Sequence, residues 1–142
     1  MQNTKFSFDY DPWRLLSSEP KKPRGVMTDE FIMKFTRYLN WNLLSIYYDF
    51  SMDMLRIYQH RVNWTSVLQR TKYPDFFLRE MHLNFDSDAW YVVSKYQQLS
   101  EEFIHDFAER LDWECVGNYQ MVSEEFMKDH AKYVENINDE EE

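Results

Sequence analysis

A recurring pattern constrains this chain more than any other feature of its sequence. Residues 100–113 read SEEFIHDFAERLDW, and related stretches begin at residues 28, 51 and 123. Four tryptophans keep the same place in this pattern: Trp41, Trp64, Trp90 and Trp113. They are spaced by 23, 26 and 23 residues. Tandem repeats of this length fold into similar supersecondary units that stack on their neighbours.

Each copy of the pattern predicts two short helices. A hydroxyl residue precedes an apolar run of helical period in four copies, as helix N-caps do, at Thr28, Ser51, Ser100 and Ser123. Pro74 takes this place in the remaining copy. The second helix is expected to start at the tryptophan, after Asn40, Asn63 or Asp112. Helices this short need tertiary packing to be stable.

The interval of 26 residues carries three extra residues, which the alignment of the copies places near residues 83–88. Asp88 is the expected N-cap there, because Ala89 replaces the usual Asn or Asp. Insertions in repeat proteins map to loops, often on a binding face. A loop with that role and an insertion without function are both compatible with the sequence.

These features predict an all-α fold of tandem short helical hairpins stacked as a small α-solenoid, with an irregular N-terminal arm. The chain has only two glycines and four prolines, too few for the turns of a β-sandwich or barrel. The repeat domain is expected at residues 28–134. Its predicted core consists of the large apolar residues at equivalent positions: Trp41, Trp64, Trp90, Trp113, Phe31, Phe77, Phe103 and Phe126.

The two ends are expected to differ from the repeats. Residues 1–27 alternate aromatic and polar side chains and then carry prolines, which predicts an extended or irregular arm. This arm either covers the end of the first repeat or docks on another protein. Residues 135–142 read ENINDEEE, and a disordered acidic tail is predicted.

Charge is concentrated in the last third of the chain. The net charge of the chain is −9. Residues 100–142 carry a net charge of −11, and the rest of the chain carries +2. Such a surface disfavours direct nucleic-acid binding, which needs Lys and Arg against phosphates. A protein partner with a basic surface is favoured. The predicted contact residues are acidic side chains repeated about 23 residues apart, with a solvated face as the alternative: Glu101, Glu102, Asp106, Glu109, Glu124, Glu125 and Asp129.

No catalytic or cofactor motif is recognisable. Two glycines cannot build a phosphate-binding loop, and the single cysteine, Cys115, excludes an internal disulfide and favours the cytoplasm. Glu102 and His105 match Glu-x-x-His, but no second copy of this motif exists, so no metal site is predicted. The four histidines share no repeat position, which predicts no histidine cluster. No membrane span or signal peptide is expected.

Aromatic residues recur throughout the repeats. A tyrosine stands six residues after three of the tryptophans, at Tyr47, Tyr96 and Tyr119. A ladder of Trp and Tyr could stack nucleic-acid bases. At helical spacing, and without a basic groove, the ladder is interpreted as core.

A short helical repeat found in proteins of phages, large DNA viruses and some bacteria resembles the repeat of this chain. The resemblance lies in the order of the motifs along the chain: SEEFI, then LDW, then a tyrosine, then SEEF again. The resemblance covers residue 28 to about residue 134. It implies a helical repeat fold and no catalytic residues. It also makes a viral or mobile-element protein that binds a host factor plausible, acting in the host cytoplasm.

Two functions follow from these observations. The first is a non-enzymatic module for protein–protein interaction, plausibly one that binds and inhibits a host factor. The second is an acidic DNA mimic that blocks a DNA-binding or defence protein. An enzyme is not expected.

Overall fold

A computed structural model describes residues 27–140, with side chains through residue 135. These residues form α-helices and two short 3-10 turns, and no β-strand occurs among them. The all-α prediction is therefore confirmed for this part of the chain. The chain divides into two compact units, Met1–Asn63 and Trp64–Glu142, where the sequence predicts one repeat domain at 28–134. The predicted N-terminal arm lies outside the described residues, apart from Met27.

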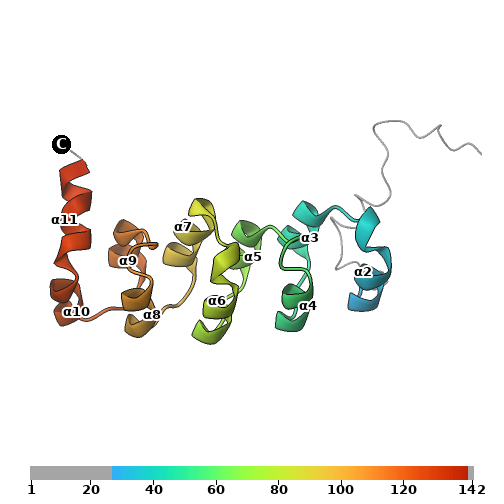
Figure 1. The fold of residues 1–142 in the computed structure, drawn as a ribbon, viewed down its shortest axis with the longest axis horizontal. Coiled ribbons are helices and arrows are strands. Elements are labelled where there is room, and N and C mark those ends of the chain that lie inside the picture. Colours follow the sequence, from blue (N-terminus) through green and yellow to red (C-terminus); the bar gives the residue numbers. More distant parts are fainter. Residues whose placement is uncertain (1–26, 141–142) are drawn as a thin grey trace, which may run out of the picture. The chain divides into compact units, whose positions relative to one another are not determined.

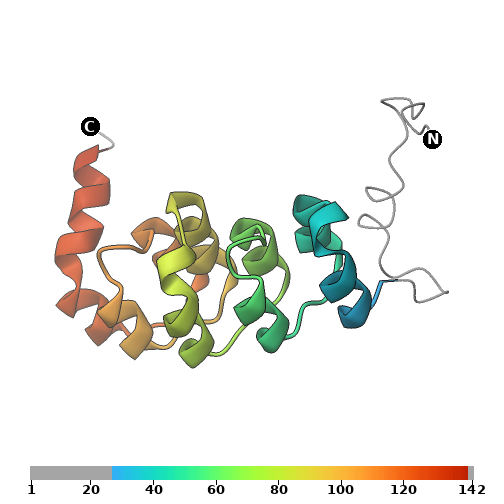
Figure 2. The same ribbon diagram turned by 45° about the vertical axis from the view of Figure 1, so that its right-hand side comes forward.

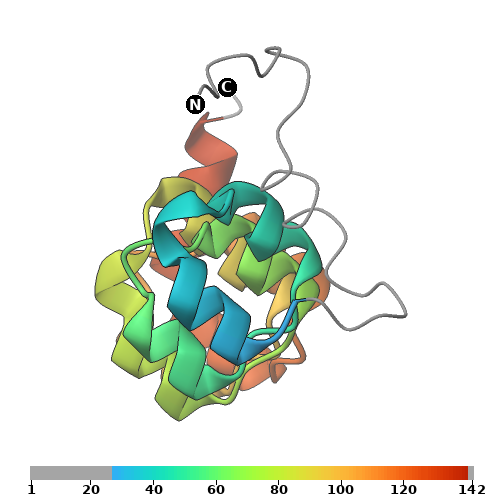
Figure 3. The ribbon, with the colours of Figure 1, turned by 90° about the vertical axis from the view of Figure 1, so that its right-hand side faces the viewer.

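The described part of the first unit contains three α-helices (Figure 3). Helix α2 (Asp29–Phe35) runs into a 3-10 turn (Thr36–Tyr38), followed by α3 (Trp41–Tyr47) and α4 (Met52–Ile57). Their N-caps are the predicted ones. The side chains of Thr28, Asn40 and Ser51 accept the N–H groups of the third residue beyond each of them, at 3.0–3.1 Å.

The second unit contains seven α-helices among its described residues. They are α5 (Trp64–Arg70), α6 (Asp75–Met81), α7 (Ser87–Tyr96), α8 (Glu101–Asp106), α9 (Trp113–Tyr119), α10 (Glu124–Asp129) and α11 (Ala131–Glu140), with a 3-10 turn at His82–Asn84. Helix α7 packs against both α5 and α9, and α9 packs against α11. Within this unit α6, α8 and α10 form a second row below α5, α7 and α9 (Figures 1 and 2).

Side-chain caps fix the starts of the helices in the second unit. Ser100, Ser123 and Asp112 each accept the N–H of the third residue onward, at 3.0–3.1 Å, as the sequence predicts. Pro74 is the N-cap of α6, without a side-chain hydrogen bond. Each such cap satisfies one backbone N–H that the helix leaves unpaired.

The three extra residues do not form a loop, which corrects the prediction for residues 83–88. The N-cap of α7 is Asp86 and not Asp88, because the Asp86 carboxylate accepts the Ala89 N–H at 2.9 Å. The helix therefore begins at Ser87, three residues before Trp90, whereas α3 and α9 begin at their tryptophans. The insertion is absorbed as an additional N-terminal turn of α7.

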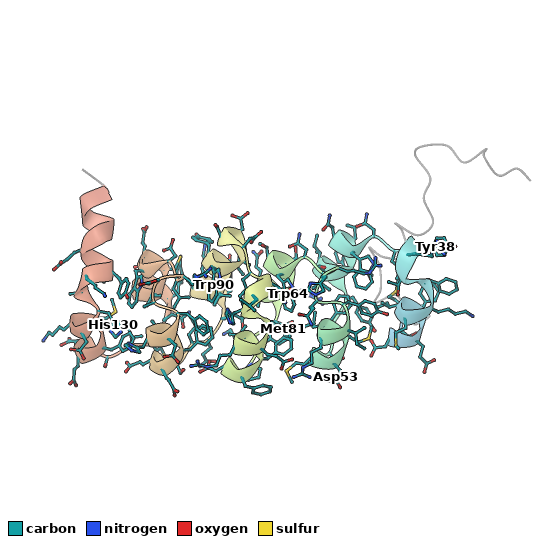
Figure 4. All side chains as sticks on the ribbon, viewed as in Figure 1. Tyr38, Asp53, Trp64, Met81, Trp90 and His130 are labelled. Carbon is teal, nitrogen blue, oxygen red and sulfur yellow. The ribbon has the colours of Figure 1, made fainter. Side chains whose placement is uncertain are left out.

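Most of the predicted core residues are buried. Six of the eight are at most 9% exposed: Trp64, Trp90, Trp113, Phe77, Phe103 and Phe126. Figure 4 shows Trp64 and Trp90 between the two rows of helices. The prediction fails in part for Trp41 and Phe31, which are only half-buried. They belong to the first two described helices, α2 and α3.

Tryptophans at equivalent positions make equivalent contacts. The indole N–H of Trp113 donates to the Ala108 carbonyl at 2.8 Å, and that of Trp41 donates to the Thr36 carbonyl at 3.0 Å. The acceptor is the residue five positions earlier in both cases. Trp90 differs, because its indole N–H is buried and has no hydrogen-bond partner.

Two buried serines, Ser45 on α3 and Ser94 on α7, each connect their helix to a later segment of the same unit. Ser94 donates to the Trp90 carbonyl at 2.8 Å and accepts the Asp112 N–H at 2.9 Å. Ser45 makes the same pair of bonds with Trp41 and Asn63. Buried polar groups need such partners, so these serines align neighbouring hairpins within each unit.

Two glutamines connect neighbouring hairpins of the second unit in the same way. The Gln97 amide donates to the carbonyls of Leu68 and Thr71, and its oxygen accepts the Tyr73 N–H at 2.8 Å. Gln120 repeats the arrangement one hairpin later, donating to the carbonyls of Ser94 and Gln97 at 2.8 and 2.7 Å. Each amide thus caps the end of the preceding tryptophan helix.

The C-terminal end departs from its prediction. Helix α11 continues to Glu140, past residue 135, where the sequence predicts the start of a disordered tail. Neither proline nor glycine interrupts residues 131–140, so the backbone can continue as helix. None of the described helices is both long and apolar enough to cross a membrane.

The Tyr48 phenol gives the first unit a pH-dependent contact. It donates to the Asp29 carboxylate at 2.5 Å, and burial, followed by this bond, raises the pKa of Tyr48 well above its ordinary value. A raised folded-state pKa favours the neutral phenol. The contribution of the Tyr48–Asp29 contact to stability is therefore complete below about pH 10 and is lost as the pH rises further.

We therefore expect Tyr48→Phe to remove part of the alkaline loss of stability. Urea unfolding of wild type and variant between about pH 8 and pH 11.5, a range that brackets the unperturbed pKa of tyrosine, measures this. The wild type should be more stable at the lower pH, and the difference should shrink as the pH rises. A difference that is constant across this range would show that the phenol has no such role.

Candidate interaction surface

Exposed tyrosines gather around one lysine on α7 and α9. Tyr91, Tyr96 and Tyr119 are 45%, 36% and 55% exposed. The Lys95 Nζ lies 5.9, 5.3 and 5.4 Å from the centres of these three rings, within the range of cation–π interaction. We call these four residues the tyrosine–lysine face.

Helical geometry explains why these side chains point outward. Helix α7 buries Trp90, Val93 and Ser94, the residues at helical spacing on its inner side. Tyr91 and Lys95 are four positions apart and share one side of the helix, away from these three residues. Tyr119, at the end of α9, joins them because α9 packs beside α7.

The face corrects the interpretation of the tyrosine ladder as core. Tyr96 and Tyr119 are exposed, and so is Tyr47 of the first unit, at 45%. The residue three positions after the tryptophan is buried in each of these helices: Leu44, Val67, Val93 and Val116. A residue six positions after the tryptophan lies about 120° around the helix from it, off the buried side.

The electrostatics of the face centre on Lys95. Neighbouring phenol groups, with Tyr119 the largest contributor, raise the pKa of this lysine. Three rings hold the ammonium in place, which limits the side-chain freedom that binding would otherwise remove. Tyrosine offers a broad apolar ring with a hydroxyl that donates and accepts, and for this reason it is enriched at protein interfaces.

Cys115 lies on α9 and is only 5% exposed. Burial raises the pKa of its thiol, and the Asp112 carboxylate raises it further. The thiolate is the reactive form of cysteine. This residue therefore has the environment of a structural thiol and not that of a catalytic nucleophile.

The predicted acidic contact residues fall into two groups. Glu101 and Asp106 have roles within the fold: Glu101 accepts the Ser123 N–H at 2.7 Å, and Asp106 forms an ion pair with Arg79 at 2.8 Å. The other five are exposed on or beside α8 and α10: Glu102, Glu109, Glu124, Glu125 and Asp129. The sequence did not distinguish the groups, since Arg79 belongs to the preceding repeat.

Two histidines lie in contact in the structure, although the sequence predicts no histidine cluster. His130, labelled in Figure 4, donates from Nδ1 to the Phe126 carbonyl at 2.8 Å. Its Nε2 lies 2.9 Å from Nδ1 of His105. In the previous pair of helices, Arg79 lies 5.6 Å from the centre of the Phe107 ring. Arg79 and His105 occupy one repeat position, and Phe107 and His130 another. The contact between His105 and His130 therefore repeats the contact between Arg79 and Phe107 one repeat later. The repeat frame alone does not show that these two positions are in contact.

The described residues of the second unit line several open pockets. The first, of about 560 Å³, lies at the start of α7 and is lined by Phe85, Trp90 and Leu111 among others. The second, of about 430 Å³, lies beside His82, His105 and Tyr133, and the third, of about 360 Å³, lies beside Gly117 and Met127. Within the described residues, no group of three or more His, Cys, Asp or Glu side chains is placed to hold a metal ion.

Comparisons with other proteins add no assignment. No protein-family model, curated protein or solved structure matches this chain.

Proposed function

We propose that this protein is a non-enzymatic module for protein–protein interaction, built from two-helix repeats that stack as a small α-solenoid. The observation that carries the proposal is the tyrosine–lysine face on α7 and α9. Exposed aromatic side chains grouped around a positioned charge are typical of residues that dominate binding energy at interfaces. A repeat fold provides extended surfaces of this kind more readily than deep clefts.

The partner we propose is a protein with a basic surface. Residues 100–142 carry a net charge of −11, and six of the seven predicted acidic contact residues on α8, α10 and the segments beside them are exposed. Such a charge accelerates encounter with a basic partner. The resemblance of the repeats to those of phage and viral proteins supports a host factor as the partner, bound and inhibited in the host cytoplasm.

Removing two rings from the face should abolish capture of the partner. We expect tagged wild-type protein to retain a specific protein from an extract of the source or host cell, and Tyr96→Ala/Tyr119→Ala to retain at least about tenfold less, as for two central interface residues. Ile57→Ala, at a residue that is 58% exposed on α4, is the matched control and should behave as wild type. Quantitative mass spectrometry of the captured proteins measures the effect.

Folding of each variant is checked by circular dichroism. Equal capture by wild type and by the double tyrosine variant would contradict the assignment of the face. Failure of all three proteins to retain any specific protein would contradict the interaction module itself.

An acidic DNA mimic is the second candidate, and the exposed carboxylates of Glu102, Glu125 and Asp129 favour it. The same capture at rising salt separates the two functions. A charge mimic loses its partner steeply as salt screens the exposed charges, whereas binding through aromatic contacts persists. Reversing these three residues to Lys tests the mimic without breaking the ion pair of Asp106.

A further inference from the structure

His130 is an ionisable ring enclosed by aromatic side chains near the end of the second unit. It is 8% exposed, and it stacks on Phe126, Trp113 and Tyr133, with ring centres 4.0, 5.6 and 6.2 Å away. Trp113 belongs to α9, Phe126 to α10 and Tyr133 to α11. The His130 ring is therefore part of the packing that holds the last two helices on α9.

The hydrogen bonds of His130 determine where its proton lies. The Phe126 carbonyl can only accept, so Nδ1 of His130 carries the hydrogen that it donates at 2.8 Å. In the neutral ring Nε2 is then an acceptor, and it receives the Nδ1–H of His105 at 2.9 Å. We call His105 and His130 the histidine pair. The pair is closed when one hydrogen lies between the two facing nitrogens.

The closed pair has room for one added proton but not for two. His105 is exposed, and the first proton can enter at its Nε2, on the side of the ring away from the facing nitrogen. The bond between the rings then becomes charge-assisted, which strengthens it. The second proton puts a hydrogen on both facing nitrogens, and at 2.9 Å two N–H groups of two cations repel each other. The rings must then separate.

The charged groups around the pair do not neutralise a second proton. The pocket beside His105 is lined by the ionisable side chains of His82, Asp106, Glu109, Arg110 and Tyr133. Asp106 is paired with Arg79 of α6 at 2.8 Å. Within three positions of either ring the other charged residues are Glu102, Lys128, Asp129 and Lys132. Carboxylates and basic groups balance in this set, and His82 itself gains charge as the pH falls.

The preceding repeat makes the equivalent contact with groups that do not titrate. The Arg79 guanidinium, which stays charged, lies 5.6 Å from the centre of the Phe107 ring. In the last repeat both positions hold a ring whose charge ordinarily changes between about pH 5 and pH 8. The same contact between helices is thus independent of pH in one repeat and dependent on it in the next.

We propose that the histidine pair is a pH-sensitive clamp on α10 and α11. It holds these helices on α8 and α9 with up to one added proton and releases them when a second proton enters. The released state binds one proton more than the closed state, so a lower pH favours release, and the equilibrium constant for opening rises by up to about tenfold per pH unit. This device does not depend on the proposed function.

Amide hydrogen exchange of α10 and α11 tests the clamp. Rates corrected for the intrinsic pH dependence of exchange give the opening constant between about pH 7.5 and pH 5. We expect it to rise in wild type as the pH falls and to stay nearly constant in His105→Gln. The glutamine amide stays neutral, donates to the neutral His130 ring and accepts from the protonated one. His60→Gln, at an exposed histidine of the first unit, is the matched control and should respond as wild type.

The ring ¹⁵N resonances of wild type follow the protons themselves. We expect His130 to carry its hydrogen on Nδ1 at about pH 8, the pair to take up one proton with the rings in contact, and the second proton to enter only as the contact with Trp113 is lost. Two histidines that take up protons independently, with their contact intact when both are charged, would overturn the proposal even if His105→Gln does not fold. An opening constant that rises as steeply in His105→Gln as in wild type would also overturn it.

Discussion

Trp113→Ala is expected to lower the free energy of unfolding by about 3–5 kcal/mol, the range for truncating a large buried aromatic residue. Trp113 is 6% exposed and stacks on Tyr133, with ring centres 5.0 Å apart, and on His130 at 5.6 Å. Its removal leaves a cavity between α9 and the helices that follow. It also leaves the Ala108 carbonyl without its donor. Urea unfolding followed by far-UV circular dichroism measures the loss.

A pair of phenylalanine variants separates packing from hydrogen bonding. Trp113→Phe keeps most of the ring volume and loses the bond to Ala108, whereas Trp90→Phe removes a donor that has no acceptor. Trp113→Phe should therefore be the more destabilising of the two, because only that change leaves a buried carbonyl unpaired. A melting temperature unaffected by Trp113→Ala would contradict the buried position of this residue.

The sequence predicts the local structure well because the signals for helix starts are themselves local. Thr28, Ser51, Ser100 and Ser123 each cap the helix that follows, three residues from the N–H that they accept. Such a cap depends on one side chain and the backbone next to it. The buried tryptophans of the second unit were predictable for a similar reason, since each is the largest apolar residue at its repeat position.

The repeat spacing does not determine the local structure of the insertion. Spacing alone locates three extra residues but does not say whether they form a loop or a turn of helix. Asp86 and Asp88 are both capable N-caps, and the structure selects Asp86. The buried Trp90 N–H of the same helix has no hydrogen-bond partner, which the sequence does not predict either.

The surface was the least predictable part. Tyr96 and Tyr119 are aromatic residues at helical spacing, which by itself predicts a place in the core. Only the packing of α7 on its neighbours shows that they face outward. Asp106 looked like a free acidic contact, but its ion-pair partner, Arg79, lies one repeat earlier. Contacts between repeats decide such cases, and a pattern within one repeat does not contain them.

Gln97→Leu is expected to destabilise the second unit by about 3 kcal/mol or more, because it leaves several backbone groups without partners at a cost of roughly 1–3 kcal/mol each. Gln97 is 2% exposed, and its amide serves the carbonyls of Leu68 and Thr71 and the N–H of Tyr73. Leucine has a similar volume, so packing is largely preserved and the loss reports on hydrogen bonding.

Two further variants test this explanation. Gln97→Glu retains an acceptor for the Tyr73 N–H but removes the donors and buries a charge beside two carbonyls, so it should be at least as destabilising as Gln97→Leu. Gln120→Leu removes the equivalent amide one hairpin later, and because Gln120 is half-buried, water can replace part of what is lost. The expected order of stability in urea unfolding is therefore wild type, Gln120→Leu, Gln97→Leu. If the Gln97→Leu variant proved as stable as wild type, the backbone groups at the end of α5 would have found other partners. Packing alone would then hold α5 against α7.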